Sequence, residues 1–253
     1  ARPMEAPEYN KKFIDQITSA KVSQTQGTLG TPFIWGATNS WGGVRTRNFQ
    51  YNQCEYADDI EAERIDEICE ETMGPHHMTG CFGCQVHCRA QYKIPSGPLA
   101  GKYDEGPEYT SLGAFGAETD TPRAETVLTG NYLVNQFGMD NLETGSLISW
   151  AMELYELGII TDKETDGLDL SWGNDNAVLE MVERICYRKG WLADALADGG
   201  IPASKKIGKN SFDYLVQVKG MSNLHSDERP TPGLALNVAT ASRGSDHLRS
   251  RPA

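Results

Sequence analysis

Three patterns that would each define a broad class of protein are missing from this sequence of 253 residues. No apolar run approaches the ~20 residues of a membrane-spanning helix. The 23 lysine and arginine residues are scattered and form no basic stripe of the nucleic-acid-binding kind, and the net charge is −12. The first residues also lack the charged and then apolar order of a signal peptide. We therefore expect a cytoplasmic protein with no membrane span and no nucleic-acid partner.

Alternation of apolar and polar residues, the pattern of half-buried strands, is also scarce and occurs only near residues 31–35 and 213–218. Helical spacing dominates the rest of the chain. It predicts helices near residues 7–19 and 56–73, at residues 122–136, from Asn141 to Gly158 and from Asn174 to Gly190. The sequence therefore predicts a mainly α fold with few short strands.

Residues at the expected helix ends are those that commonly begin and end helices. Asn141 is expected to cap one helix, and Gly138 to close the helix before it. Thr121 and Pro122 are expected to open that earlier helix. Cys186 falls on the apolar side of a later helix, so we predict that it lies in the core.

Segments rich in glycine and proline occur at residues 24–48, 94–107 and 219–234, and we expect them to be loops. The last of them follows a run of helices and is the best candidate for a domain boundary. We therefore expect a helical domain over residues 1–218 and the start of a further domain over residues 219–253.

Among the six cysteines, Cys81, Cys84 and Cys88 form a C-x2-C-x3-C group. Without a secretory signal, cysteines are better explained as metal ligands or core thiols than as disulfides. Core packing does not require three cysteines at this spacing, whereas three nearby thiolates can converge on one metal centre. We therefore predict a metal site here, in a segment that turns into a helix.

Two kinds of metal centre remain open at this site. A structural zinc ion needs four ligands, and His87 could join the three thiolates. His87 lies directly beside Cys88, where reaching the same metal is awkward, whereas a [4Fe–4S] cluster accepts three near thiolates and a remote cysteine. Iron–sulfur is therefore favoured. Because Cys54, Cys69 and Cys186 lie in no second motif, the fourth position is either open or filled from beyond this chain.

Five blocks of the sequence resemble the aldehyde:ferredoxin oxidoreductase family. They are G-V-R-T-R-N-F at residues 43–49, the C-x2-C-x3-C group, G-P-E-Y-T-S-L at 106–112, N-Q-F-G-M-D at 135–140 and A-T-A-S-R-G-S-D-H-L-R at 239–249. Members of that family are more than twice as long. They have a β-rich N-terminal domain and a C-terminal segment that supplies the fourth cluster cysteine. The resemblance therefore implies an internal fragment that covers the family's second domain and the start of its third.

The resemblance also implies catalytic residues. Glu108 would lie beside the metal, where burial would suit it to general acid/base work. His247 would donate a hydrogen bond to the substrate carbonyl oxygen or shuttle a proton. For His225, in the loop at the expected domain boundary, two interpretations are open: a residue that lines the substrate channel, or an exposed loop histidine. The second is favoured, and His225 is left out of the site.

A pterin-binding motif is implied by the block at residues 135–140. The expected cofactor-binding residues are Asn135, Gly138, Met139 and Asp140. Asn135 stands where the family has aspartate, and Met139 where it has leucine. Further along, Arg249 would bind a pterin phosphate through its forked guanidinium group.

The function implied by the resemblance is oxidation of an aldehyde to a carboxylic acid. The expected cofactors are a tungsten (or molybdenum) bis-pyranopterin and a [4Fe–4S] cluster, with ferredoxin or an iron–sulfur subunit as electron acceptor. The fragment alone is expected to be inactive, and a homo-oligomer is compatible with the sequence. Two alternatives stay open at this point: the tungsten subunit of a benzoyl-CoA reductase and a non-catalytic zinc-binding helical module.

Overall fold

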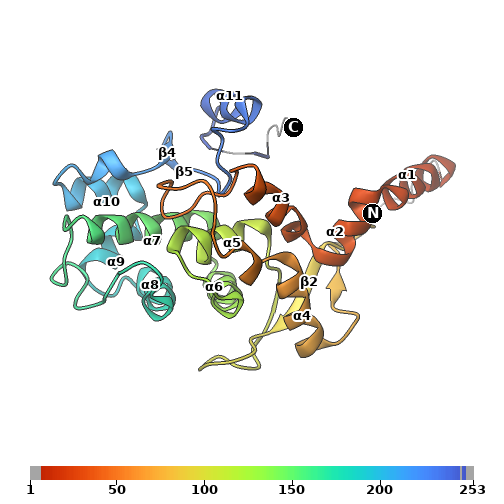
Figure 1. Cartoon of the computed structure of the whole chain (residues 1–253), viewed down its shortest axis with the longest axis horizontal. Coiled ribbons are helices and arrows are strands. Elements are labelled where there is room, and N and C mark those ends of the chain that lie inside the picture. The colour runs from red at the N-terminus through yellow and green to blue at the C-terminus, as the bar shows by residue number, and fades with distance from the viewer. Residues whose placement is uncertain (1–6, 246, 249–253) are drawn as a thin grey trace.

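The computed structural model describes residues 7–245 and 247–248, and its regular structure is mainly helical (Figure 1). The helices are α1 (Pro7–Ser19), α2 (Lys21–Leu29), α3 (Trp35–Ser40), α4 (Ala62–Met73), α5 (Tyr109–Phe115), α6 (Ala124–Phe137), α7 (Asn141–Glu156), α8 (Asp175–Tyr187), α9 (Trp191–Leu196), α10 (Gly200–Ile207) and α11 (Pro232–Thr240). The strands within these residues are β1 (Met78–Thr79), β2 (Arg89–Lys93), β3 (Tyr103–Glu105), β4 (Gln217–Val218) and β5 (Met221–Ser222). The predicted mainly α fold is confirmed.

Helix α7 lies at the centre of the largest core and packs against α5, α6 and α8 (Figure 1). Every residue from Thr144 to Met152 is buried, so the helix is covered on all sides along this stretch. Trp150 and Met152 have no exposed surface. The buried Trp150 indole N–H donates a hydrogen bond to the Ser211 carbonyl oxygen at 3.1 Å, which satisfies the one polar group of that side chain. We call α5 to α10 the helical body.

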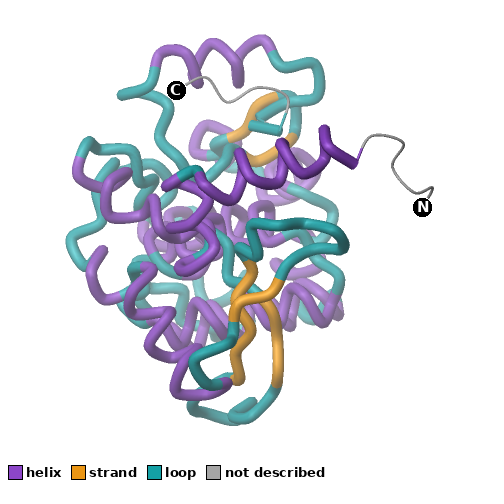
Figure 2. Tube along the Cα trace, turned by 90° about the vertical axis from the view of Figure 1, so that its right-hand side faces the viewer, coloured by secondary structure: helices purple, strands orange, loops and turns teal. Residues whose placement is uncertain are grey.

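A smaller core joins α4 to an antiparallel sheet of order β1-β2-β3. Met78 pairs with Ala90 and Tyr92 pairs with Asp104. The buried side of α4, which includes Ile65 and Ile68, shares a hydrophobic cluster with β2. Figure 2 shows the strands side by side at one edge of the molecule. This sheet is where the cysteine segment joins the fold.

Helices α1 and α11 lie at the periphery. Helix α1 buries none of its residues and extends away from the rest of the chain in Figures 1 and 2. Helix α11 follows the β4–β5 pair and buries Leu234 and Val238. Of the helices in the described part of the chain, none is long and apolar enough to cross a membrane.

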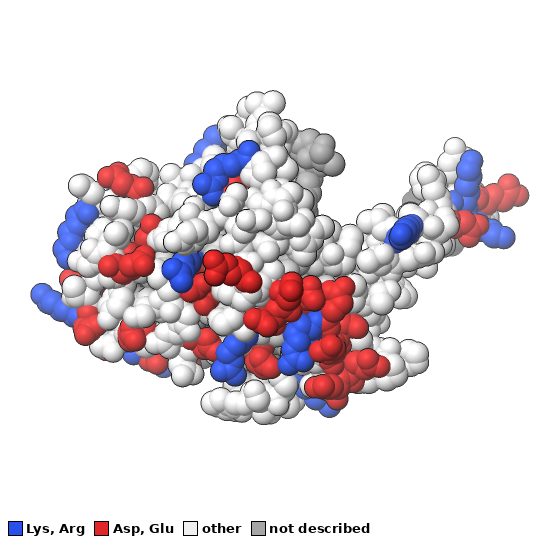
Figure 3. All heavy atoms as spheres, in the orientation of Figure 1, with Lys and Arg blue, Asp and Glu red and all other residues white. Residues whose placement is uncertain are grey.

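Charged side chains are unevenly placed on the face shown in Figure 3. Acidic side chains gather over α4, where the sequence carries Glu63, Glu67, Glu70 and Glu71, all exposed. Lysine and arginine side chains appear singly or in small groups on this face. An acidic patch therefore lies beside the small sheet on this face.

The predicted helices at residues 7–19, 141–158 and 174–190 are confirmed as α1, α7 and α8. The predicted cap of α7 was wrong by one residue, because the Asp140 side chain, not that of Asn141, accepts the free N–H of Glu143. Helix α6 begins at Ala124, two residues later than predicted. It ends as expected at Gly138, whose φ of 65° is the left-handed conformation that glycine adopts without strain.

Several predictions of local structure were wrong because tertiary packing overrode weak patterns. Residues Thr31–Ile34 form a 3₁₀ turn with Pro32 at its start, not a strand. Residues 24–48, expected to be a loop, contain most of α2 and all of α3. Cys88 leads into strand β2 and not into a helix. Cys186, expected in the core, is half-buried at the end of α8.

The proposed boundary at residue 219 stays a prediction. Strands β4 and β5 pair across it, with Val218 opposite Met221. The chain then runs back against the loop of residues 43–49, where Ser226 forms a bridge with Val44. These contacts place residues 222–228 in the interior, beside α5 and α7.

Candidate functional site

The three cysteines of the C-x2-C-x3-C group lie in one tight loop and all carry free thiols. The Cys84 N–H donates to the Cys81 carbonyl oxygen at 2.9 Å, which closes a turn between these two residues. Gly83 and His87 have positive φ values of 74° and 55°, so the loop bends sharply twice. Cys81 is exposed, whereas Cys84 and Cys88 are half-buried. The loop therefore presents its thiols at the surface.

The donor chemistry of this loop fits a thiophilic centre such as an iron–sulfur cluster. In the residues that the structure describes, no group of three or more His, Cys, Asp or Glu side chains is already arranged as metal ligands. The thiols are nonetheless close enough to interact. Burial, the Glu108 carboxylate and the other two thiols together raise the pKa of Cys88 above its ordinary value. Cys81, Cys84 and Cys88 are thus the residues that would hold a cluster.

Glu108 is held at the N-terminus of α5 by its neighbours. Its side chain and that of Ser111 form a reciprocal capping box, which satisfies two backbone N–H groups of the first turn. The Thr31 hydroxyl donates to the Glu108 carboxylate and accepts the Tyr109 N–H at 2.8 Å. Glu108 itself is exposed in the described chain. The carboxylate is therefore positioned by α5 and by the turn of Thr31–Ile34 while facing open space.

Glu108 opens onto a cavity of about 400 Å³, which we call the Glu108 cavity. His247, from near the other end of the chain, lines the same cavity. The remaining lining residues are Gln26, Thr31, Phe33, Ile34, Tyr109, Thr110, Leu224, His225 and Ser226. The structure thus brings together the two residues that the sequence suggested for catalysis, and it adds a second histidine.

The residues of the expected pterin motif lie at the junction between α6 and α7, where each also has a structural contact. Asp140 caps α7 by accepting the Glu143 N–H at 2.8 Å. Met139 packs against the helical body. Gly138 ends α6 and has open space beside it, since an added Cβ would meet nothing within 4 Å. None of the motif residues lines the Glu108 cavity, and their pterin role stays a prediction.

Asn135, at the start of the same motif, donates a hydrogen bond to the Asp104 carboxylate at 2.9 Å. The Tyr92 hydroxyl and the Asn131 amide donate to the same oxygen at 3.1 and 3.0 Å. Burial raises the pKa of Asp104, and these three donors oppose that rise. An aspartate at position 135 would place a second carboxylate here, so an amide suits this position. Arg249, the expected phosphate ligand, lies outside the described residues.

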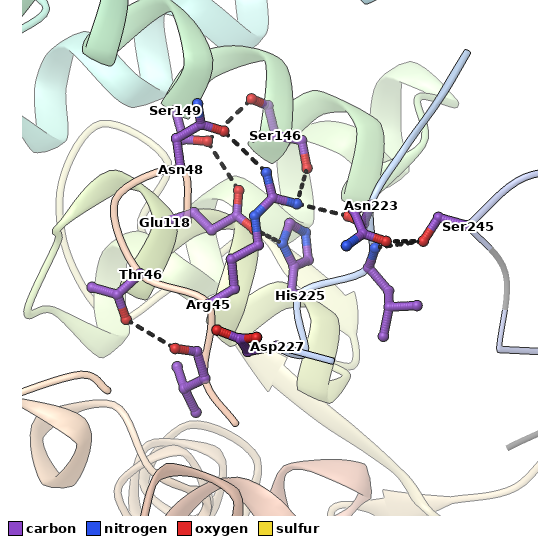
Figure 4. A network of polar contacts seen from close by, with 12 residues as sticks. Arg45, Thr46, Asn48, Glu118, Ser146, Ser149, Asn223, His225, Asp227 and Ser245 are labelled. Carbon is purple, nitrogen blue, oxygen red and sulfur yellow. Dashed lines mark hydrogen bonds and ion pairs between the residues drawn. The ribbon is translucent and has the colours of Figure 1, made fainter. Parts of the chain in front are cut away.

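A buried group of charges lies behind the Glu108 cavity (Figure 4). Arg45, Glu118 and His225 are each 0–1% exposed. The Arg45 Nε atom lies 2.8 Å from Glu118 Oε1, an ion pair whose angle is not that of a hydrogen bond. His225 Nδ1 contacts the same Glu118 oxygen, and the Ser149 hydroxyl donates to the other one at 2.9 Å. We call these residues, with Asn48, Ser146 and Asn223, the Arg45 network.

The outer bonds of the network anchor the guanidinium group of Arg45. It donates to the Asn223 carbonyl oxygen at 2.8 Å and to Asn48 Oδ1 at 3.0 Å. Its plane also lies over the Phe49 ring, with Cζ 4.7 Å from the ring centroid. A buried guanidinium is tolerated only when its donors find partners. The network thus ties the loop of residues 43–49 to the segment of residues 222–229.

The charges of the network determine one another's ionisation. Burial opposes the ionisation of Glu118, but Arg45 and His225 more than offset this effect and lower the pKa of Glu118. Burial likewise lowers the pKa of Arg45, against the attraction of Glu118 and other carboxylates. Glu118 is therefore a carboxylate at neutral pH, held between a guanidinium and an imidazole.

His225 was interpreted from the sequence as an exposed loop histidine, and this interpretation was wrong. The side chain is 1% exposed, lines the Glu108 cavity and pairs with Glu118, which lies 107 residues away. One sequence signal was available. Glu118 follows the apolar stretch L-G-A-F-G-A, where a buried charge requires a partner of opposite sign or a hydrogen-bond donor.

Comparison with known proteins identifies the family. A match to the family described as aldehyde ferredoxin oxidoreductase, domains 2 & 3, covers residues 8–253. The chain is 32% identical over 222 residues to a tungsten-containing aldehyde ferredoxin oxidoreductase of Thermococcus kodakarensis. The matched residues make up 87% of this chain and 35% of the relative. A protein of the same description from Pyrococcus horikoshii is 30% identical over 223 residues, again 87% of this chain and 35% of the relative.

Two further similar proteins are described as other kinds of oxidoreductase. The WOR-like subunit of an aliphatic sulfonate oxidoreductase of Pyrococcus furiosus is 30% identical over 174 residues, or 66% of this chain and 27% of that subunit. A solved active-site complex of benzoyl coenzyme A reductase, bound to 1,5-dienoyl-CoA, matches with a TM-score of 0.70 and 17% identity over 92% of this chain and 35% of that chain. At this identity the likeness shows the fold alone.

The named relatives are oxidoreductases, and the chain belongs to the aldehyde ferredoxin oxidoreductase family. The resemblance inferred from the five sequence blocks is thereby confirmed. The chain spans about a third of the length of the curated relatives it matches, 35% in the first two.

Proposed function

We propose that the intact protein oxidises an aldehyde to a carboxylic acid and passes the electrons through a [4Fe–4S] cluster to ferredoxin or an iron–sulfur subunit. The observation that carries this proposal is the shared cavity of Glu108 and His247, two residues from distant parts of the sequence. The names of the relatives support the tungsten centre and the substrate class.

Within this proposal, the residues of the Glu108 cavity bind the substrate and move protons. A tungsten–pterin centre, when bound, supplies the two-electron oxidation and the placement of oxygen. Glu108, exposed and held by Thr31, can accept or donate a proton at its carboxylate. His247 donates a hydrogen bond to the carbonyl oxygen and so polarises the carbon that water attacks.

Cofactor binding is shared between two surfaces of the chain. Cys81, Cys84 and Cys88 supply three thiolates for the cluster, and the fourth ligand is expected from a part of the protein outside this chain. Glu108 is close enough to Cys88 to raise the pKa of its thiol. The proposed cluster ligand Cys88 and the proposed acid/base residue Glu108 thus lie near each other.

The pterin is expected to bind at the junction between α6 and α7. The open space at Gly138 lets a ring system approach the backbone, and the nearby Asp140 side chain is exposed. Asn135 and Met139 complete this expected surface, and Arg249 would contact a phosphate group. Cytoplasmic location, oligomeric state and the choice between tungsten and molybdenum also stay predictions.

Elemental analysis of the anaerobically purified, full-length protein tests the proposal. We expect about four irons for each cluster together with tungsten, and dye reduction with aldehydes in a viologen assay. Zinc alone, without tungsten or molybdenum, would instead support the zinc-binding module. A protein that holds the pterin but reduces the dye with none of a panel of aldehydes would contradict the reaction.

A second candidate function is favoured by one relative. Because the aliphatic sulfonate oxidoreductase subunit is 30% identical over 174 residues, the substrate of this protein could be a sulfonate. The same dye assay with alkyl sulfonates in place of aldehydes distinguishes the two. Benzoyl-CoA belongs in this panel as well, since its reductase shares the fold, although the dye must then act as electron donor.

A further inference from the structure

We propose that His225 is a second catalytic base in the Glu108 cavity, and that Glu118 and Arg45 are the residues that position it. This proposal rests on the proposed function for its substrate, an aldehyde and water. It is carried by a buried histidine of the cavity lining that has one paired and one unpaired ring nitrogen.

The two ring nitrogens of His225 have different surroundings. Nδ1 contacts the Glu118 carboxylate, whereas buried Nε2 has no hydrogen-bond partner among the described residues. Because a carboxylate can only accept, the neutral ring carries its proton on Nδ1 and leaves a free lone pair on Nε2. His225 is one of the residues that line the Glu108 cavity, and its fully buried side chain places Nε2 just behind the cavity surface. A buried polar atom without a partner is suited to bind a ligand or water.

Glu118 is equipped to stabilise the imidazolium that forms when Nε2 takes a proton. Its carboxylate is ionised because Arg45 lies 2.8 Å away and Ser149 donates at 2.9 Å. A buried carboxylate at Nδ1 both orients a catalytic histidine and stabilises its charged form. Arg45 keeps Glu118 from taking the proton itself, since the ion pair favours the carboxylate. The three side chains therefore form a directed series that ends at the cavity.

Steric contacts fix the imidazole in this orientation. A Cβ added at Gly113 of α5 would lie 2.4 Å from His225 Cβ and 2.7 Å from its Cγ. The absence of a side chain at Gly113 thus lets the ring pack directly on α5, the helix that Glu108 caps. The Tyr109 hydroxyl, also from α5, donates to the His225 carbonyl oxygen at 3.5 Å. Both proposed proton acceptors therefore contact α5: Glu108 caps it and His225 packs against it.

The proton balance of the reaction requires two acceptors. Oxidation of an aldehyde by water forms a C–O bond and breaks the aldehyde C–H bond and one O–H bond of water. The products are a carboxylic acid, two protons and two electrons, and an iron–sulfur acceptor takes the electrons one at a time. His225 Nε2 takes the proton of water as the C–O bond forms. Glu108 takes the second proton.

Several titratable groups lie around His225. Glu118 contacts His225 Nδ1 and pairs with Arg45, Glu108 and His247 line the same cavity, and Asp227 and Glu228 belong to the same segment as His225. Because several groups contribute, the pH profile of the wild-type enzyme alone does not identify His225. The test therefore uses chemical rescue.

The first experiment replaces the base and restores it from solution. In the full-length, cofactor-loaded enzyme, His225→Ala should lower kcat by roughly 10²- to 10⁴-fold with a smaller change in KM. Imidazole and its methylated derivatives, added to this variant, should restore turnover in the order of their basicity. His76→Ala, which removes an exposed histidine, is the matched control and should change neither value.

The rescue series distinguishes a base from a structural side chain. Rescue that follows the size of the added imidazole and ignores its basicity would overturn the proposal, as would full activity of His225→Ala. Glu118→Gln keeps a hydrogen-bonding group but loses the charge. In this variant the acid limb of the curve of kcat against pH should move relative to wild type. Unchanged iron and tungsten contents in each variant show that the loss of activity is not a loss of cofactor.

The second experiment does not depend on activity. Diethyl pyrocarbonate acylates unprotonated imidazole nitrogens, and peptide mass spectrometry locates the modified residue. We expect modification of His225 through the cavity, with protection by a carboxylate product. No modification of His225 under conditions that label His247 would contradict a reachable Nε2. If the protein lacks tungsten and oxidises no aldehyde, the proposed function fails, whereas labelling of His225 still reports whether a reagent in the cavity reaches the buried Nε2.

Discussion

The core of the helical body and the Arg45 network are both buried, but they are held together by different forces. Around Trp150 and Met152 the contacts are apolar and non-directional. Around Arg45 and Glu118 the contacts are charged and geometrically specific. An apolar core of this kind could be repacked with other side chains of similar volume. A buried charge network is costly unless every member is paired, so its presence beside a cavity indicates function.

The largest effect should come from breaking the charge network. Arg45→Met leaves Glu118 buried without its cation, and we expect it to lower the free energy of unfolding by about 3 to 5 kcal/mol. Denaturant titration followed by tryptophan fluorescence measures the change. In the double variant Arg45→Met/Glu118→Leu most of the loss should be recovered, because no uncompensated charge remains. A loss below about 1 kcal/mol in the single variant would show that the pair is solvated.

The pH dependence of that loss has a definite sign. In the wild type the lowered pKa of Glu118 means that its contribution to stability is present above the unfolded value of ~4.3 and is lost as pH falls through the folded value. Without Arg45, burial is opposed only by His225 and Ser149, so the protonated acid is more favoured than in the wild type. The deficit of Arg45→Met should therefore grow as pH rises above ~4.3 and shrink in acid. A deficit that is constant with pH would rule out Glu118 as its source.

In the helical body the corresponding change is Met152→Ala. It removes a fully buried side chain, and the lost contacts plus the cavity should cost about 2 to 5 kcal/mol. Met152→Leu, which nearly conserves volume, should cost less than about 1.5 kcal/mol. Both costs should be the same at acid and neutral pH, since no charge is involved. A strong pH dependence of Met152→Ala would remove the contrast with the network.

Two glycines allow the same substitution in both regions. Gly113→Ala would push a Cβ to 2.4 Å from His225 Cβ, and Gly145→Ala would push one to 2.4 Å from Ala114 Cβ. Each should cost about 1 to 3 kcal/mol through overpacking. Only Gly113→Ala should also lower kcat of the folded, cofactor-loaded enzyme, because it displaces His225. Equal activity losses at matched folded fractions would mean that the position of His225 does not matter.

An effect no larger than that of the glycine substitutions is expected at the junction of α6 and α7. Asn135→Asp replaces a donor to Asp104 with a second carboxylate, at a cost of about 1 to 3 kcal/mol at neutral pH. Burial already raises the pKa of Asp104, so the two acids favour protonation in the folded protein. The deficit should therefore be small near pH 4 and grow as pH rises. Asn135→Gln, which keeps an amide, is the control in the same unfolding experiment.

The sequence predicted the helices whose ends carry strong local signals. Asn174 caps α8 and Gly138 closes α6, because capping and left-handed glycine depend on a few neighbouring residues. Prediction failed where those signals are weak. The turn of Thr31–Ile34 was read as a strand, and β2 was missed, since a short strand depends on partners elsewhere in the chain.

The candidate site divides in the same way. The spacing of Cys81, Cys84 and Cys88 is visible in the sequence, and the resemblance pointed to Glu108 and His247. Their common cavity needed the structure. His225 was misread as exposed because nothing within several residues of it indicates burial. Its partner Glu118 is 107 residues away in the sequence.

By itself, the sequence determined the mainly α fold, the family and the thiol group, because helical periodicity, caps and motif spacing act within about one or two turns of chain. Only the tertiary structure decided which charges are buried. Burial of Arg45, Glu118 and His225 results when α5, α7 and the segment of residues 222–229 close around them, and the free energy of a buried charge depends on those distant partners. The proposed base of this protein therefore exists only in the folded chain.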